Sequence, residues 1–289
     1  MNYTEQNIVL KDKAMWTYST QPQPVSAVLA DAYRLYKKSF SKVWYWHLIL
    51  FLPMSLFSIF SEFYAKVLPL YSLWIATAIV VMIYLFGECF LLYRIDGIAR
   101  QGDSDTEQGW SWASKKIFPV IVLYFFTLIF LGITVFFIAS LPIFNQTAIT
   151  EASLVGKFIM ALQFPITIGL SVLLAYYFWF MAFIIMMDIV IRNQPLLTAL
   201  KQAFSLVAGN WWRSFVAIML GSALLFVAAK IFGSIAFSIT GSYVVEVIAI
   251  LLAYVLFHSV FNSVLLVQFN DLQLRQAQPL PGLGSSLVE

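Results

Sequence analysis

Three polar side chains stand within or beside long apolar stretches of the sequence, and these residues are the best placed to carry chemistry. Glu88 directly follows the apolar stretch 67–87, whereas His258 lies near the middle of the stretch 247–270, with Asn262 one helical turn further on. An ionisable side chain inside a bilayer costs about 2.5–3.5 kcal/mol on insertion scales, so it normally faces a partner or a water-filled space. Glu88, His258 and Asn262 therefore predict either a polar pathway for a solute or proton, or hydrogen bonds that join helices.

Covalent chemistry has little support in the sequence. Glu88 and Asp188 form the one credible pair of carboxylates, and they would have to lie within about 10 Å of each other to act together on a lipid. Asp188 stands one helical turn before Arg192, and this spacing predicts a salt bridge along a helix. One Cys and two His show no spacing typical of a metal site, and phosphate-binding and hydrolase motifs are absent. We therefore expect no catalytic residue, cofactor, metal or enzymatic activity.

The composition indicates which solvent surrounds the elements that position these residues. Of the 289 residues, 61% are hydrophobic and 11% are charged, whereas soluble domains average about 45–50% and about 25%. Aromatic residues make up 17% of the chain, as expected where Trp and Tyr line two membrane interfaces. These values exclude an ordinary soluble enzyme and predict a membrane protein.

Stretches with few or no charged residues give the number of membrane spans. A helix needs about 20 apolar residues to cross the hydrocarbon core of a bilayer. Lys230 interrupts one stretch, but near its far end, where the long side chain can reach the interface. The sequence thus predicts six spans, over residues 43–61, 67–87, 117–141, 164–187, 214–240 and 247–270.

Lys and Arg are distributed unequally between the two sides that six spans create. With both termini on one side, 14 of the 17 basic residues fall on that side, and only Lys66, Lys157 and Lys230 fall on the other. Basic residues concentrate in the cytoplasmic loops of membrane proteins. We therefore expect a multi-pass protein with both termini in the cytoplasm.

The chain repeats a unit of an amphipathic segment followed by spans. The segment from Pro24 aligns without gaps on the segment from Pro195, and a weaker copy runs through 110–116. In the two clear copies, apolar residues recur at helical spacing in front of a polar face. We therefore predict an all-α polytopic membrane protein whose six transmembrane helices form three parallel hairpin units, each preceded by a cytoplasmic interfacial amphipathic helix. The units are 24–94, 95–192 and 193–270, and we expect mobile cytoplasmic ends over 1–23 and 271–289.

Basic residues on the amphipathic segments predict contacts with lipid head groups. Cations on an interfacial helix face anionic lipids. Because these cations stand at membrane-entry points and do not gather on one soluble face, nucleic acid is not an expected partner. Membrane lipids are the expected partners, and a membrane-protein partner or a second copy of the chain is a further candidate. The predicted head-group contacts are Arg34, Lys37, Lys38, Lys42, Lys115, Lys116, Lys201 and Arg213.

Short motifs at the span entries resemble a known family. They are Ala32-Tyr33, Lys38-Ser39-Phe40 and Trp44 in the first copy, and Ala203-Phe204 and Gly209-Asn210-Trp211-Trp212-Arg213 in the second. Over most of residues 24–270 the chain resembles bacterial six-span inner-membrane proteins of the YciC type, and also the membrane domain fused to some glycerophosphodiester phosphodiesterases. The resemblance implies a location in the bacterial inner membrane. It brings no catalytic residue with it and does not extend to the soluble phosphodiesterase domain.

Two functions remain open on this reading. The first is an inner-membrane protein without catalytic activity that acts by lipid contact or as a scaffold for partner proteins. The alternative is a transporter or channel for a small or amphiphilic solute, with a polar pathway near Glu88, His258 and Asn262. A polar cavity beside these side chains would favour the alternative.

Overall fold

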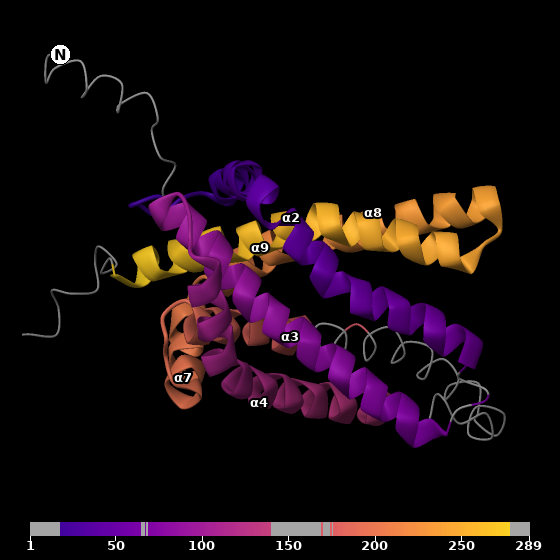
Figure 1. Ribbon diagram of the computed structural model, residues 1–289. Coiled ribbons are helices and arrows are strands. Elements are labelled where there is room, and N and C mark those ends of the chain that lie inside the picture. Colours follow the sequence, from indigo (N-terminus) through magenta and orange to yellow (C-terminus); the bar gives the residue numbers. More distant parts are fainter. Residues whose placement is uncertain are drawn as a thin grey trace, which may run out of the picture.

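The computed structural model describes residues 18–64, 67, 69–139, 169, 174 and 176–277, and every regular element in these ranges is a helix (Figure 1). The helices are α2 (Val25–Tyr64), α3 (Leu70–Gln101), α4 (Thr106–Ala139), an unlabelled helix over Tyr176–Val190, α7 (Leu196–Val207), α8 (Trp211–Thr240) and α9 (Tyr243–Ala277).

Five of these helices, α2, α3, α4, α8 and α9, are long and apolar enough to cross a membrane. Large apolar side chains cover their outer faces; Leu56, Trp74 and Phe118, for example, are 57%, 67% and 73% exposed. So much exposed apolar surface is unfavourable in water and suits contact with lipid. The protein is therefore a multi-pass helical membrane protein.

The five helices overlap five of the six predicted spans, namely 43–61, 67–87, 117–141, 214–240 and 247–270, although α3 begins at Leu70 and α4 ends at Ala139. The remaining predicted span, 164–187, lies partly outside the described residues, and the helix Tyr176–Val190 covers its second half.

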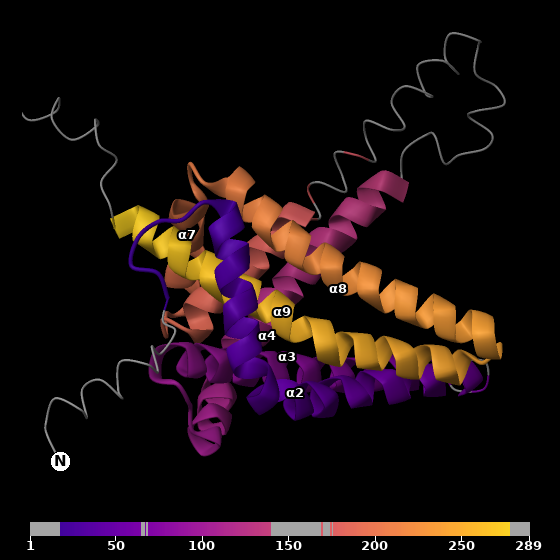
Figure 2. The same ribbon diagram turned by 90° about the horizontal axis from the view of Figure 1, so that it is seen from above.

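The amphipathic segments lie across the bundle before the chain turns along it. The first part of α2 crosses the other helices and its second part runs beside them (Figure 2), and α4 bends in a similar way (Figure 1). In the third copy the amphipathic segment and the membrane span are separate helices, α7 and α8. The chain breaks between them at Gly209, which has a φ of +74°. Glycine adopts positive φ without steric cost. Lys38 occupies the aligned position of the first copy, where the helix is continuous.

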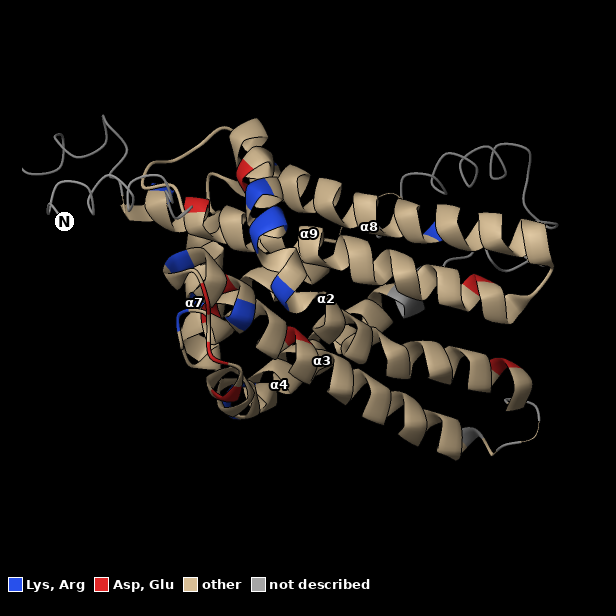
Figure 3. Ribbon diagram, turned by 45° about the horizontal axis from the view of Figure 1, so that its top comes forward, with Lys and Arg blue, Asp and Glu red and all other residues tan. Residues whose placement is uncertain are grey.

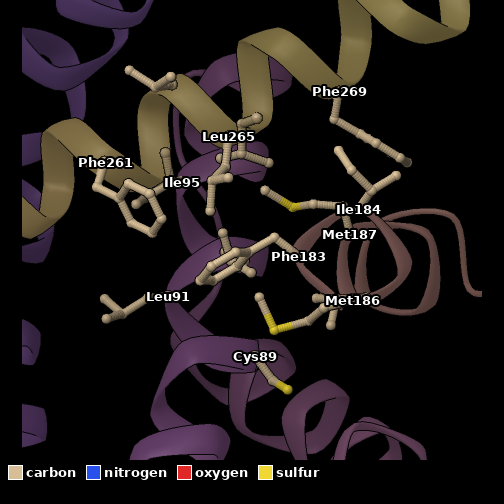
Figure 4. Close-up of a cluster of buried hydrophobic side chains, with 14 of the residues drawn as sticks. Cys89, Leu91, Ile95, Phe183, Ile184, Met186, Met187, Phe261, Leu265 and Phe269 are labelled. Atoms are coloured by element: carbon tan, nitrogen blue, oxygen red, sulfur yellow. The ribbon is translucent and has the colours of Figure 1, made fainter. Parts of the chain in front are cut away.

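α9 is the central helix of the bundle, because it packs along both α2 and α8. The helix Tyr176–Val190 is buried on all sides from Phe180 onward. Figure 4 shows its Phe183 and Met187 in one buried cluster with Leu265 of α9 and Ile95 of α3. A helix that is apolar all round is expected in such an enclosed position. Close contact between α2 and α3 depends on Gly87, where an added Cβ would lie 2.2 Å from a methyl carbon of Leu50.

Charged residues gather at one end of the bundle, where the first described residues and the end of α9 also lie (Figure 3). Residues 18–23, placed in a mobile N-terminus by the sequence, contact the helices here: Tyr18 donates a hydrogen bond of 2.9 Å to Asp96. The predicted tail also begins too early, since α9 continues to Ala277 and Asp271 is only 2% exposed. These ends are held by polar contacts that link segments far apart in the sequence.

Candidate functional site

The three predicted pathway residues meet in one buried cluster between α3 and α9. Nε2 of His258 lies 2.9 Å from Oε1 of Glu88, and the amide nitrogen of Asn262 lies 3.3 Å from Oε2 of Glu88. The same amide nitrogen is 3.4 Å from Nδ1 of His258. All three residues are at most 2% exposed. The structure therefore joins an acid, an imidazole and an amide in a buried position between helices, where polar groups without partners are costly.

His47 of α2 completes this cluster. Its side chain is fully buried, and its ring centroid lies 5.4 Å from that of His258. Ser259 contacts the ring at 3.3 Å, and the carbonyl of Val43 lies 3.0 Å from Nδ1. His47 shares a buried stripe with Val43 and Leu50; this helical spacing was the signal that could have placed it inside.

One polar atom of the cluster, Oδ1 of Asn262, has no hydrogen-bond partner among the described residues. Oε1 of Glu88 has Nε2 of His258 beside it at 2.9 Å. An unsatisfied buried polar atom costs about 1–3 kcal/mol. Such atoms in a folded protein call for a specific explanation, of which a functional site is one.

A cavity of about 460 Å³ lies next to the cluster, and His258 and Tyr84 form part of its wall. It extends to Tyr243 and Glu246 at the start of α9, which is about 22 Å along that helix from His258. Met54 and Phe226 also line it and are 37% and 49% exposed, so the cavity reaches the lipid-facing surface. A volume of several hundred Å³ is typical of sites for small organic ligands.

Four of the eight predicted head-group cations are exposed, and they are Arg34, Lys37, Lys115 and Lys201. Lys38 is partly buried, and this burial lowers the pKa of its amine.

Several predicted head-group cations contact partners within the protein, and Arg34, although exposed, lies 3.0 Å from Asp31. Lys42 donates to the carbonyl of Gly102 and lies 3.5 Å from Asp103. The backbone N–H of Ser104 lowers the pKa of the Asp103 carboxyl, which keeps it a charged partner. Lys116 donates to the side chain of Asn193, and Arg213 pairs with Asp271.

Arg213 belongs to a buried junction that the sequence did not reveal. The carboxylate of Asp271 lies 3.1 Å from Arg213 and 2.9 Å from Arg275, and it accepts a hydrogen bond of 2.6 Å from the backbone N–H of Gln23. Both guanidinium groups also donate to the carbonyl of Gln23. The junction ties the first described segment to the start of α8 and the end of α9.

The predicted salt bridge between Asp188 and Arg192 is confirmed at 3.1 Å. Asp188 is thus committed to Arg192 and Glu88 to His258, so the two carboxylates have separate partners. Among the residues that the structure describes, no group of three or more His, Cys, Asp or Glu side chains could hold a metal ion.

Fold and site together define a polytopic helical membrane protein with an acid–imidazole pair beside a membrane-facing cavity. Comparison of the chain with protein-family models, curated proteins and solved structures finds no match.

Proposed function

We propose that this chain is a non-enzymatic inner-membrane protein that takes up an amphiphilic molecule from the bilayer into the cavity beside His258. The observation that carries the proposal is the continuous cavity of about 460 Å³, which has exposed Met54 and Phe226 at its surface and the buried polar cluster in its wall. An amphiphile matches such a site, because its apolar body replaces lipid contacts and its polar end finds hydrogen-bonding groups.

The topology is part of the same proposal. Six spans in three parallel hairpin units, both termini in the cytoplasm and membership in the YciC-type family are supported by the charge asymmetry and the repeated entry motifs. The contacts of α2 with α3 and of α8 with α9 are those that two of the hairpins require. With this orientation the turn between α8 and α9, and with it Tyr243 and Glu246, faces the periplasm.

Filling the cavity tests the proposal. Ser55 of α2 lines the cavity, whereas its neighbour Leu56 is 57% exposed on the lipid face. Ser55→Trp places an indole in the cavity, and Leu56→Trp places one on the outer surface as a matched control. We expect purified wild-type protein to retain a monoolein adduct in native mass spectrometry. Ser55→Trp should reduce adduct occupancy at least fivefold, and Leu56→Trp should leave it unchanged.

Equal monoolein occupancy in wild type and Ser55→Trp would contradict the cavity as the binding site. Thermal unfolding of both variants in detergent provides the folding control. If Ser55→Trp unfolds early, Ser58→Trp serves as the second filling variant, because Ser58 also lines the cavity.

The exposed cations support a second mode of lipid contact, with anionic head groups. Replacing Arg34, Lys37, Lys115 and Lys201 together by Gln is expected to weaken binding of phosphatidylglycerol at low salt by about tenfold or more. The wild-type preference should itself decline between 0.05 and 0.5 M salt as exposed charges are screened. Association measured in nanodiscs of graded phosphatidylglycerol content checks both effects. Lys230→Gln on α8 is the control, and a preference that survives the fourfold replacement would contradict this contact.

A further inference from the structure

We infer that a second site, separate from the cavity beside His258, binds one anionic phospholipid. The acyl chain lies in an apolar groove at Trp46, called the Trp46 groove below, and the phosphate lies between Lys42 and Arg94. There it takes the place that the carboxylate of Asp103 occupies in this structure. The groove shares no lining residue with the cavity beside His258, so the inference goes beyond the proposed function.

The Trp46 groove is an apolar space of about 480 Å³ between α2, α3 and α4. Trp46 of α2, Phe86 of α3 and Trp110 of α4 form part of its wall, and none of the described residues that line it is charged. Ile49 and Met82, which also line it, are 52% and 51% exposed on the lipid-facing surface. An acyl chain can therefore enter the groove sideways from the bilayer.

Two cations stand one helical turn beyond the groove, one on each of two neighbouring helices. Lys42 precedes Trp46 by four residues on α2, and Arg94 follows Phe90 by four residues on α3. Residues four apart share a helix face, so both cations lie in line with groove residues. Ile83, at the other end of the groove, is about 16 Å along α3 from Arg94, close to half of the roughly 30 Å hydrocarbon core. The site therefore has the length of one phospholipid in one leaflet.

Arg94 lacks a close partner for its charge. Its side chain is 7% exposed, and its ion-pair partner among the described residues is Asp103, at 4.0 Å. Nε of Arg94 has no hydrogen-bond partner among these residues. Arginine is rarely buried unless it is paired, and the fork of a guanidinium matches the oxygens of a phosphate. Arg94 is thus placed to bind an anion more closely than it contacts Asp103.

The carboxylate of Asp103 contacts both cations loosely. One of its oxygens lies 3.5 Å from Nζ of Lys42, and the other lies 4.0 Å from Nη2 of Arg94. Its side chain is 69% exposed, and it belongs to the turn between α3 and α4. Carboxylate and phosphate accept guanidinium donors in the same forked arrangement. A lipid phosphate can therefore replace Asp103, which then turns to water, and the charge beside the two cations stays balanced.

The groove and the cations together select the class of ligand. A soluble phosphate ester would contact the cations and leave the groove unfilled, whereas a phospholipid uses both parts. A zwitterionic lipid brings its own cation to the phosphate and so gains less from Lys42 and Arg94. Basic pockets between membrane helices on the cytoplasmic side are known to bind anionic head groups. Phosphatidylglycerol, which carries one net negative charge, has the required chemistry.

Titration of the full chain in detergent, followed by native mass spectrometry, tests the inference. The probes are phosphatidylglycerol, phosphatidylcholine with the same acyl chains, and glycerol 3-phosphate. We expect the first phosphatidylglycerol to bind at least tenfold more tightly than the first phosphatidylcholine, and glycerol 3-phosphate to compete with neither. Equal affinity for the two lipids would overturn the inference. Competition by glycerol 3-phosphate would also overturn it, because the site would then belong to a soluble phosphate ester.

Charge variants locate the phosphate. Arg94→Gln should weaken phosphatidylglycerol binding at least fivefold, and Asp103→Asn should strengthen it about threefold, because the competing carboxylate is gone. Glu107→Gln removes the same charge from an exposed position in the first turn of α4, and it should leave the affinity unchanged. Equal gains from Asp103→Asn and Glu107→Gln would mean general attraction and would overturn the site. If Arg94→Gln unfolds early in detergent, Lys42→Gln serves as the second variant.

Filling the Trp46 groove locates the acyl chain. Met82→Trp should weaken phosphatidylglycerol binding at least fivefold, whereas Ile79→Trp should not, because Ile79 is 53% exposed on the same helix and does not line the groove. Unchanged binding in Met82→Trp would overturn the inference. Ser55→Trp, which fills the cavity beside His258, should leave phosphatidylglycerol binding unchanged, and a loss there would place the lipid in that cavity instead. The monoolein adduct tests only that cavity, so the two sites can fail independently.

Discussion

Replacement of Asp271 by Ala is expected to destabilise the folded protein by about 3 kcal/mol, one of the two largest effects that the structure predicts. The carboxylate is 2% exposed and serves two guanidinium groups and the backbone N–H of Gln23. Its removal leaves Arg213 and Arg275, whose side chains are only 20% and 26% exposed, close together without an anion. Unfolding in detergent, followed by circular dichroism against added denaturant, measures the change.

Asp103→Ala is the control for this prediction. Asp103 lies 3.5 Å from Lys42 and 4.0 Å from the buried Arg94, but its own side chain is 69% exposed, and pairs with an exposed member contribute about 1 kcal/mol or less. A loss of stability in Asp271→Ala no larger than that in Asp103→Ala would show that the junction at Gln23 does not hold the ends of the chain.

Substitution of His258 by Gln gives the second large effect, a loss of about 3 kcal/mol, because it removes the imidazole that lies 2.9 Å from the buried carboxyl group of Glu88. Glu88→Gln alone should cost less, since it removes the charge itself. The double variant should be more stable than the sum of the single effects predicts, by about 2 kcal/mol, because two amides can pair in the space left by the ions.

The same unfolding measurement completes this double-mutant cycle. Additive effects of Glu88→Gln and His258→Gln would mean that the two side chains, although 2.9 Å apart, do not interact in the folded protein. Ser263→Ala provides a control in the same helix, because among the described residues its hydroxyl donates to the carbonyl of Ser259, within the helix itself.

The sequence predicted the features that depend on residues close together in the chain. Long apolar stretches located five helices, and polar residues within them pointed to Glu88, His258 and Asn262. Their approach depends instead on the packing of α3 against α9, which brings together Glu88 and Asn262, residues 174 positions apart. Periodicity within one helix carries no information on such a contact.

The junction at Asp271 escaped prediction for the same reason. Its surroundings at the end of α9 are polar and read as an exposed tail, and the carboxylate becomes buried only when Gln23 and Arg213 close over it. The bend of α2 is a further case, because an amphipathic segment and an apolar segment in succession do not indicate whether the helix breaks between them. In the third copy Gly209 permits a break, and Lys38 at the aligned position does not favour one.

The orientation of the bundle in the membrane is the central claim, because it decides on which side the basic end and the outer end of the cavity lie. Single cysteines at Thr240, the end of α8, and at Gln101, the end of α3, are both exposed and can be introduced after Cys89→Ala removes the native thiol. With a membrane-impermeant maleimide on spheroplasts, we predict labelling of Thr240→Cys at once and of Gln101→Cys only after the membrane is permeabilised. Labelling of Gln101→Cys in sealed spheroplasts, with Thr240→Cys protected, would contradict the account.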